Sequence, residues 1–446
     1  MDNKNTVFDR VNNWIKNSVT LKLVTITILM LFLLIPSNMI KSIIAEREDL
    51  SNAAINEVSS KWGASQQING PILTIPVIYE YLTDEKIEQI TEYFHILPEE
   101  LNINGLIEPE KLKRGIYEVV VYNSELSISG KFNLNKKVDQ SNLVQILYDQ
   151  AFLTLGISDL RGIEDQINLD WNNEELKVEP GSKLSNTIKS GVTVNLPDIK
   201  NNLDREIDFK LKLNLQGSQN ISFTPLGSLT NVNLKSSWPS PSFNGNFLPD
   251  HREVGNDGFN ASWKVLQLNR NYPQSWLGSK HLQNITDSAF GVDLILPIDD
   301  YQKSMRSAKY AVMTIALTFL IFFLVEILNK RRIHPFQYAL VGLALSLFYI
   351  LLVSISEHAN FNLAYLISAL GILTMISLYS LSVFKAVKLS LVLVVTLAAI
   401  YGFLFVTLQL ADYALLMGSI GLTLILGATM YFTRNINWYK LNKENE

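Results

Sequence analysis

The sequence contains no cysteine, which excludes a disulfide framework, a thiolate nucleophile and a zinc–thiolate site. Charged residues are also scarce, at 18% of 446 residues, whereas hydrophobic residues make up 48%. This balance is more apolar than that of an ordinary soluble domain. Any domain that lies in an oxidising compartment must therefore be held together by core packing.

The sequence also lacks the short motifs of several enzyme classes. It has no G-x-x-x-x-G-K-[ST] phosphate loop, so we do not expect an ATP-driven pump in one chain. It has no H-E-x-x-H and no G-x-S-x-G. The five histidines occur singly, as His95, His251, His281, His334 and His358. We therefore predict no metal, no cofactor and no catalytic residue.

Charge is distributed unevenly along the chain. Residues 41–308 contain 25 Lys and Arg and 35 Asp and Glu, a net charge of −10, and the remaining residues carry a net charge of +6. An acidic polar block beside basic-flanked apolar blocks predicts a membrane protein with one large aqueous domain. Nucleic acid is not an expected partner of this domain, because phosphate contacts need a basic face.

Six apolar segments are long enough to cross a bilayer, which takes about 20 residues. The first one has Lys16 before it and Lys22 at its start, as the apolar part of a signal peptide would. Its length and the absence of a small-x-small cleavage pattern near Ser37 favour an uncleaved anchor. The six segments are Leu21–Ile40, Tyr310–Leu328, Phe336–Ser354, Phe361–Val383, Leu389–Leu408 and Tyr413–Phe432.

The basic residues that flank these segments predict their orientation. Lys and Arg resist translocation, so basic loops stay in the cytoplasm. The loops at 356–360 and 409–412 contain neither residue, which indicates that they face outward. Both termini are then cytoplasmic. The basic flanks are Lys4, Arg10 and Lys16; Lys330, Arg331 and Arg332; Lys385 and Lys388; and Arg434, Lys440 and Lys443.

We therefore predict a multi-pass α+β protein of the bacterial inner membrane, with six transmembrane helices and a large β-rich periplasmic domain between the first two. A cytoplasmic tail (1–20) and the first span (21–40) precede the periplasmic domain (41–308), a five-helix bundle (309–432) and a second cytoplasmic tail (433–446). Residues 41–67 have helical apolar spacing and form a stalk. On the return side, Asp299 or Asp300 caps a helix that runs through Met305.

Between the stalks the pattern is typical of strands. IDFKLKLNLQG places Ile207, Phe209, Leu211 and Leu213 between polar residues, and ELSISGKFNL alternates in the same way. Short alternating runs that are separated by Gly, Pro and Asn predict antiparallel sheets in a sandwich-like arrangement.

Two acidic positions near the membrane are candidates for function. Glu326 is an ionisable group inside a span, where it is either a proton or ligand site or an acid paired with a basic residue one turn later. Glu357 with His358 is either a pH-sensing pair or part of a hydrated loop. The polar candidates at the membrane are Glu326, Lys330, Arg331, Arg332, Glu357 and His358.

In the aqueous block, the stretch SSWPSPSFNGNFLPDHREV is rich in aromatic residues and proline. It either presents a binding surface to a peptide or glycan, or it is a connection between sheets that fills its own core. The candidate residues are Trp238, Phe243, Phe247, Asp250 and Arg252.

Seven stretches of the sequence carry a resemblance: Leu33–Glu48, Gly70–Val77, Lys113–Leu126, Ser158–Ile163, Ser237–Val254, Phe322–His358 and Thr433–Tyr439. In these stretches the sequence resembles the CreD family, the cell envelope integrity proteins of the inner membrane of Gram-negative bacteria. The resemblance implies a link to envelope stress response, colicin tolerance and a two-component regulon tied to β-lactam response, and it implies no enzymatic activity. It adds Asp159 and Arg161 of SDLRGI as surface candidates, and it weakens His251 because the family tolerates other residues there.

We thus expect a non-enzymatic protein whose periplasmic domain binds or senses an envelope protein, peptide or glycan, and whose helices contact the lipid bilayer. One alternative is a secondary transporter or lipid handler that uses the bundle. Another is an enzyme that acts on lipid or glycan at the membrane face, with Glu357, His358 and Asp250. The oligomeric state stays open.

Overall fold

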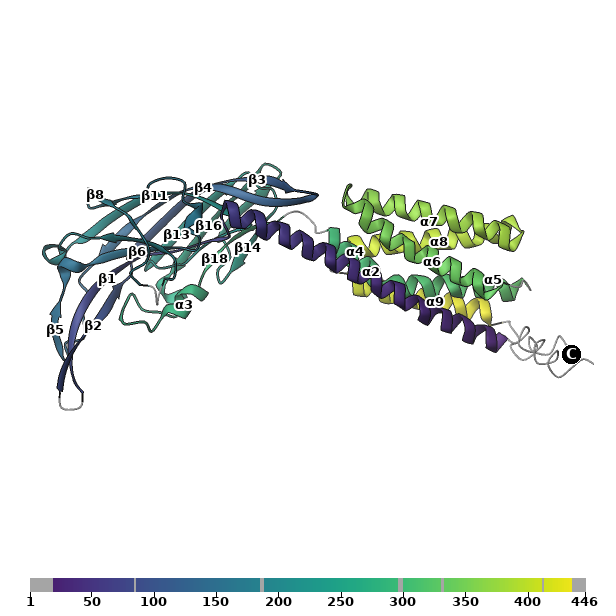
Figure 1. Cartoon of the computed structure of the whole chain (residues 1–446), viewed down its shortest axis with the longest axis horizontal. Coiled ribbons are helices and arrows are strands. Elements are labelled where there is room, and N and C mark those ends of the chain that lie inside the picture. Colours follow the sequence, from purple (N-terminus) through teal and green to yellow (C-terminus); the bar gives the residue numbers. More distant parts are fainter. Residues whose placement is uncertain are drawn as a thin grey trace, which may run out of the picture. The chain divides into compact units, whose positions relative to one another are not determined.

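The computed structural model describes residues 19–83, 86–184, 188–295, 300–329, 333–410 and 413–434. The chain divides into two compact units, one of residues 1–50 and 298–446 and the other of residues 51–297. The first is helical and the second is β-rich (Figure 1). The predicted α+β class with a large sheet domain is confirmed.

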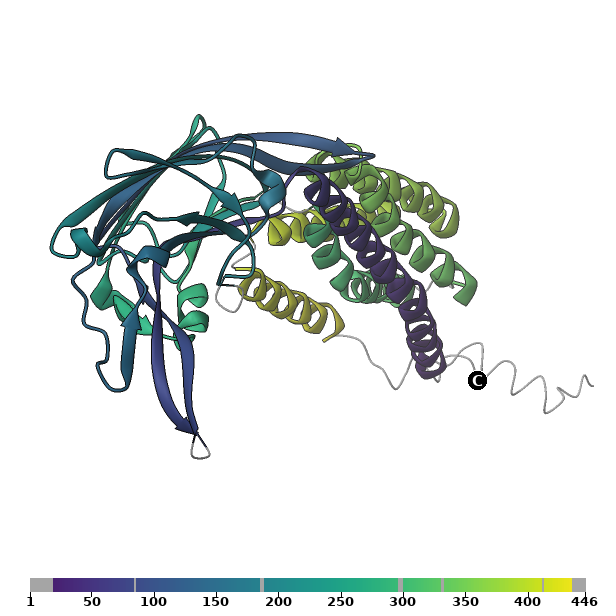
Figure 2. The same cartoon turned by 60° about the vertical axis from the view of Figure 1, so that its left-hand side comes forward.

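The helical unit is built from long apolar helices. α5, α6, α7 and α8 pack in the pairs α5–α6, α6–α7, α7–α8 and α5–α8 (Figures 1 and 2). α9 contacts α8, and most of its described residues are exposed. The helices are α2 (Val19–Trp62), α4 (Asp300–Lys309), α5 (Ala311–Leu328), α6 (Pro335–Ser356), α7 (Phe361–Phe384), α8 (Val387–Gln409) and α9 (Ala414–Thr433).

Among the described residues, α2 and α5 to α8 are long and apolar enough to cross a membrane, which makes five candidate spans. α9 occupies the position of the sixth predicted span, and by the same measure it is a shorter apolar helix over Leu416–Tyr431. A sixth span therefore stays a prediction, whereas the helical character of all six apolar segments is confirmed.

Local chemistry sets several helix ends. Pro335 begins α6, where its missing N–H costs nothing, and the His334 imidazole accepts a hydrogen bond from the backbone N–H of Phe336. The Asn360 side chain accepts from the N–H of Leu363 and so caps α7. Lys385, at a φ of 49°, ends α7 in the left-handed conformation.

α2 is one continuous helix that crosses the boundary between the units at Leu50 and Ser51. The helix continues past the predicted first span as far as Trp62 and β1 begins at Gln66, so the predicted helical stretch to residue 67 is shorter than expected, and its role as a stalk stays a prediction. The predicted return helix is α4, which opens at Asp300. Asp299 lies outside the described residues, so its proposed capping role stays a prediction.

The β unit contains two sheets. The ten-stranded sheet has the order β14-β18-β12-β1-β6-β10-β9, with β2 and β5 also paired to β1 and β17 paired to β2. Its strands are β1 (Gln66–Thr83), β2 (Lys86–Ile96), β5 (Leu143–Ile146), β6 (Phe152–Ile157), β9 (Glu179–Pro180), β10 (Gly191–Asn195), β12 (Asn220–Phe223), β14 (Pro241–Gly245), β17 (Ser275–Leu277) and β18 (Phe290–Leu294).

The eight-stranded sheet has the order β15-β16-β13-β3-β4-β11-β7-β8. A short helix, α3 (Leu282–Asp287), accompanies the sheets. The strands are β3 (Glu100–Arg114), β4 (Tyr117–Asn133), β7 (Asn168–Trp171), β8 (Glu174–Lys177), β11 (Glu206–Ser218), β13 (Leu229–Ser236), β15 (His251–Gly255) and β16 (Gly258–Leu266).

One hydrophobic core joins the inner faces of the two sheets. Ile75 of β1 and Leu153 of β6 share this core with Ile128 of β4 and Val232 of β13. In β11 the buried residues alternate with exposed or half-buried ones, as the sequence pattern predicts. The sandwich-like arrangement is therefore present, with apolar side chains inside and polar side chains outside.

Antiparallel pairing, as predicted, holds for most neighbouring strands, but two pairs differ from the prediction. β1 pairs in parallel with β12, and β13 pairs in parallel with β3. The alternation of apolar and polar residues decides which side chains face the core, but it says nothing about the direction of the neighbouring strand. Both parallel pairs join strands that lie more than 100 residues apart in the chain, where no hairpin turn fixes the direction.

Candidate functional site

Glu326 in α5 is buried, with 2% of its surface exposed, and both of its carboxylate oxygens have partners. Oε1 accepts hydrogen bonds from Lys22 Nζ at 2.5 Å and from the backbone N–H of Ile333 at 3.1 Å. Oε2 accepts from the Tyr338 hydroxyl at 2.9 Å. The carboxylate thus joins α2, α5, α6 and the segment before α6.

The sequence predicted a different partner for Glu326. Lys330 and Arg331, the expected partners, lie outside the described residues together with Arg332. The structure shows an ion pair with Lys22, which precedes Glu326 by 304 residues. A carboxylate with an ammonium partner and two further donors fits the structural role better than a proton or ligand site.

Glu357 ends α6 and turns toward α2 and α4. Its Oε1 lies 3.5 Å from Arg47 Nε and accepts a hydrogen bond of 3.4 Å from the Tyr301 hydroxyl. His358 is exposed, and its backbone N–H donates to the carbonyl of Ile355. The Glu357 carboxylate is therefore engaged with an arginine, and pH sensing by an adjacent acid and imidazole stays a prediction.

The ion pairs that join α2 to Glu326 and to Glu357 have the spacing of a membrane span. Lys22 and Arg47 are separated by about 37 Å of helix at 1.5 Å per residue, compared with a hydrocarbon layer of about 30 Å. Residues 23–40, between Lys22 and Lys41, carry no charge. This spacing places one ion pair beyond each edge of the apolar segment.

Asp159 and Arg161 form the joint between the end of α2 and the β unit. The Asp159 carboxylate accepts from Arg161 Nε at 2.9 Å, from Arg161 Nη2 at 2.7 Å and from the backbone N–H of Ala64 at 2.9 Å. Arg161 Nη1 donates to the carbonyl of Ser60 in the last turn of α2. These hydrogen bonds, led by those from Arg161, lower the pKa of Asp159 to about 2.

A buried glutamine completes this joint. Gln66 Nε2 donates to the carbonyl of Asp159 at 3.0 Å and to the carbonyl of Gln216 at 2.9 Å. The Asp159 N–H donates back to Gln66 Oε1. Asp159 therefore serves to fix the helix end and is buried, whereas the Arg161 side chain keeps 61% of its surface exposed.

The aromatic stretch that was a candidate binding surface belongs largely to the core. Trp238 is 6% exposed, and its indole N–H donates to the carbonyl of Ile295. Phe243 packs edge-on against Trp263, and Phe247 packs edge-on against Phe290. The interpretation of Trp238 as a surface residue is corrected, because its side chain is buried. Phe243 and Phe247 are half-buried and pack against the same core, where the segment crosses from the ten-stranded sheet to the eight-stranded sheet. This agrees with the second alternative, a connection between sheets that fills its own core.

The polar end of the same segment is exposed. β15 forms one edge of the eight-stranded sheet, and all five of its residues are exposed. Asp250 precedes it and accepts a hydrogen bond from the backbone N–H of Lys264 at 2.7 Å. Arg252 lies in β15 and borders the groove described next.

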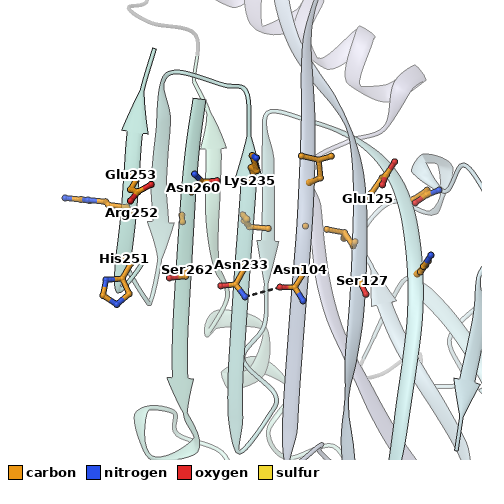
Figure 3. Close-up of a pocket in the computed structure, with 17 residues that line it drawn as sticks. Asn104, Glu125, Ser127, Asn233, Lys235, His251, Arg252, Glu253, Asn260 and Ser262 are labelled. Carbon is orange, nitrogen blue, oxygen red and sulfur yellow. Dashed lines mark hydrogen bonds between the residues drawn. The ribbon is translucent and has the colours of Figure 1, made fainter. Parts of the chain in front are cut away.

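A groove of about 810 Å³ lies on the outer face of the eight-stranded sheet, which we call the sheet groove (Figure 3). It extends over β15, β16, β13, β3, β4 and β11, and amide, hydroxyl and charged side chains line it together with apolar surface from Leu106, Leu126 and Leu234. Asn233 Nδ2 donates to Asn104 Oδ1 at 3.0 Å in its middle. The exposed lining includes Asn104, Glu125, Asn233, Lys235, His251, Arg252, Glu253 and Asn260.

Sequence reasoning missed this groove, Lys22 and Tyr338. The alternation along β3, β4 and β13 marks the outward residues, but strand order is needed to bring them together.

The predicted site residues also fall into two groups, because Glu357 and His358 belong to the helical unit and Asp250 and Arg252 to the β unit. Within the described ranges, no three His, Asp or Glu side chains gather in a way that could hold a metal ion.

Comparisons with known proteins agree on one family. The family model described as "Inner membrane protein CreD" matches residues 18–439. The chain is similar to the protein named "Inner membrane protein CreD" from Escherichia coli (strain K12), with 35% identity over 416 residues, which cover 92% of this chain and 91% of the relative.

The Glu326 ion pair predicts a specific pattern of stability. Glu326→Gln leaves the Lys22 ammonium without its carboxylate and should lower the free energy of unfolding by about 1.5–3 kcal/mol. In the variant with both Lys22→Met and Glu326→Gln, no charge is left unpaired, so most of the loss should be recovered. Thermal unfolding of the detergent-purified chain measures both effects. Equal stability of the single variant and the parent would contradict the structural role.

The Asp159 joint predicts a loss of stability in acid. Its pKa is about 2 in the folded protein and 3.8 ordinarily, so the stabilisation is complete above about pH 5 and disappears as the pH falls through 4 to 2. The contribution is about 2 kcal/mol. In unfolding midpoints measured from pH 5 to 2.5, Asp159→Asn should show a shallower acid slope than the parent. The exposed residue Asp208 supplies the control, and Asp208→Asn should keep the parent slope.

Proposed function

The chain belongs to the CreD family of inner membrane proteins, and we propose from this premise that it is a non-enzymatic, envelope-facing receptor of the inner membrane. Its helical unit anchors it in the bilayer. Its β unit faces the periplasm, binds an envelope component and in this way supports envelope integrity and the response to envelope stress. Both termini are cytoplasmic in this proposal.

The orientation is supported by charge and by length. Short loops rich in Lys and Arg alternate along the chain with short loops that contain neither, as expected when basic loops stay in the cytoplasm. The uncharged stretch of α2 between Lys22 and Lys41 spans about 27 Å, close to the thickness of the hydrocarbon layer. An outward β unit follows, because it is inserted between the first and second apolar helices.

The sheet groove is the observation that carries the receptor role. A solvated sheet face is ordinarily polar, but here it is also hollowed, with side chains from six strands around one space. Among the residues that the structure describes, the two most buried carboxylates, Glu326 and Asp159, are occupied by structural partners. The groove therefore offers polar groups that are free to meet a ligand.

The two alternatives have less support. A transporter needs polar groups that face a pathway, whereas the buried acid Glu326 is held by Lys22 and Tyr338. The matching family is described as a membrane protein, with no catalytic activity named. An enzyme at the membrane face would need Glu357 for chemistry, and this carboxylate contacts Arg47 and Tyr301.

The orientation can be tested because the chain has no cysteine of its own. Lys137 is an exposed residue of the β unit, and Lys388 is an exposed residue at the start of α8. In intact cells, a membrane-impermeant maleimide should label Lys137→Cys and leave Lys388→Cys unlabelled, whereas both should react after lysis. The reverse pattern in intact cells would place the β unit in the cytoplasm and end the proposal.

The receptor role can be tested by crosslinking in living cells. A photoreactive amino acid in place of Asn233, within the groove, should capture an envelope component. The matched control is Asn195, an exposed asparagine on the ten-stranded sheet. The same probe there should not capture that component. Identical products from both positions, or none from Asn233 in cells under envelope stress, would contradict binding in the groove.

A further inference from the structure

We infer that Arg306 and Lys309 of α4 bind the phosphate group of an anionic phospholipid, and that an acyl chain of this lipid lies along α5. This inference goes beyond the proposed function, because it needs only that the helical unit spans a bilayer, whichever way the chain is oriented. It is drawn from the charges of α4, from their level relative to the apolar layer and from the apolar surface of α5 next to them.

α4 has one buried face and one exposed basic face. Ser304, Ser307 and Ala308 are buried, and α4 packs against α6 and α8. Arg306 and Lys309 are exposed. Residues three apart on a helix are neighbours on its surface, so the guanidinium and the ammonium can approach one anion together. A shared anion also removes the repulsion between the two like charges.

Neither of these two cations has a partner among the residues that the structure describes. Two other basic residues near this end of the unit have partners inside the protein. Lys303 Nζ donates to Gln409 Oε1 at 3.5 Å and lies 5.2 Å from the centre of the Phe361 ring. Arg47 is paired with Glu357. The two exposed cations of α4 therefore keep their donors for a group that comes from outside the described chain.

The two cations lie at one edge of the apolar layer. Glu326 marks the opposite edge, where it pairs with Lys22. From Glu326 to Lys309 and to Arg306 the helical path is about 26 Å and 30 Å at 1.5 Å per residue, close to the thickness of the hydrocarbon layer. Tyr310, between α4 and α5, has helical backbone angles of φ −85° and ψ −2°, so this path continues from one helix into the other. The head groups of a leaflet lie just outside the hydrocarbon layer, at the level of these cations.

α5 presents an apolar strip on the same side as the two cations. Its residues recur at intervals of three or four, and this spacing continues from Arg306 and Lys309. Each of them is half-buried, so part of each side chain is open to the surroundings of the bundle. An acyl chain whose head group is held by the cations can pack along this strip. The strip consists of Met313, Ala316, Leu320, Leu324 and Ile327.

An anionic phospholipid fits this combination better than other anions do. A free phosphate or an acidic peptide would meet the two charges but would leave the apolar strip without a contact. A zwitterionic phospholipid would cover the strip, but its own cationic group would oppose Arg306 and Lys309. In the proposed orientation the two cations also lie at the outer end of a span, where Lys and Arg are scarce, which favours a specific role for them.

Binding can be counted by native mass spectrometry on the full-length chain in detergent. The probe is phosphatidylglycerol, with phosphatidylcholine of the same acyl chains as comparator. We expect phosphatidylglycerol to bind more tightly, by about fivefold or more. Arg306→Gln together with Lys309→Gln should remove most of this preference, because both charges are lost. Lys309→Arg keeps the charge and should bind like the parent.

The matched control is Lys385→Gln together with Lys388→Gln, which removes two exposed charges beside α8 and should keep the preference. Equal affinity for the two lipids, an unchanged preference in the α4 double variant, or the same loss in the control would each overturn the assignment. Displacement of phosphatidylglycerol by an equal concentration of inorganic phosphate would also overturn it, because the site would then be one for a free anion. The cysteine labelling at Lys137 and Lys388 reports orientation independently, so a wrong ligand is distinguishable from a wrong orientation.

Discussion

A carboxylate cannot stay charged among apolar helices without partners, and the helical unit is organised around this constraint at Glu326. An ammonium, a hydroxyl and a backbone N–H satisfy its two oxygens. Lys22 comes before the inserted β unit in the sequence, and Glu326 comes after it. One ion pair thus closes the chain around about 300 residues and fixes the first helix among those that follow the insertion. The second pair of α2, Arg47 with Glu357, repeats the connection near the other end.

The architecture was largely predictable from the sequence because its signals are local. An apolar run of about 20 residues must bury its backbone polar groups within a helix, and an alternating strand must turn one face to the core. Hence the apolar helices, the stalk to Trp62 and the inward face of β11 agree with the patterns. The contacts between distant segments were not predictable in this way. Nothing near Glu326 in the sequence points to Lys22, and nothing in β13 shows that it lies parallel to β3.

The candidate binding surface shows the same difference between local patterns, which were predictable, and contacts between distant segments, which were not. The aromatic residues concentrated at 238–247 indicated a binding surface in the sequence. Aromatic side chains are, however, also the largest side chains that pack in a core between two sheets. The structure gives Trp238 and Phe243 that second role. The lining of the groove instead includes asparagines and serines that no sequence pattern marks as binding residues. In the sequence, each of them is one of the polar residues of an alternating strand. Only the strand order shows that Asn233 lies beside Asn104.

The position of the charged groups favours recognition over chemistry. A catalytic carboxylate must be free to exchange a proton or to bind the reacting group, and this freedom is lost when strong donors fill its oxygens. The carboxylate oxygens of Glu326 accept hydrogen bonds from Lys22 and Tyr338, and those of Asp159 accept from Arg161 and from the backbone N–H of Ala64. In the part of the chain that the structure describes, the most buried acids thus hold helices in place. The asparagine pair of the sheet groove lies instead on the exposed outer face of the eight-stranded sheet.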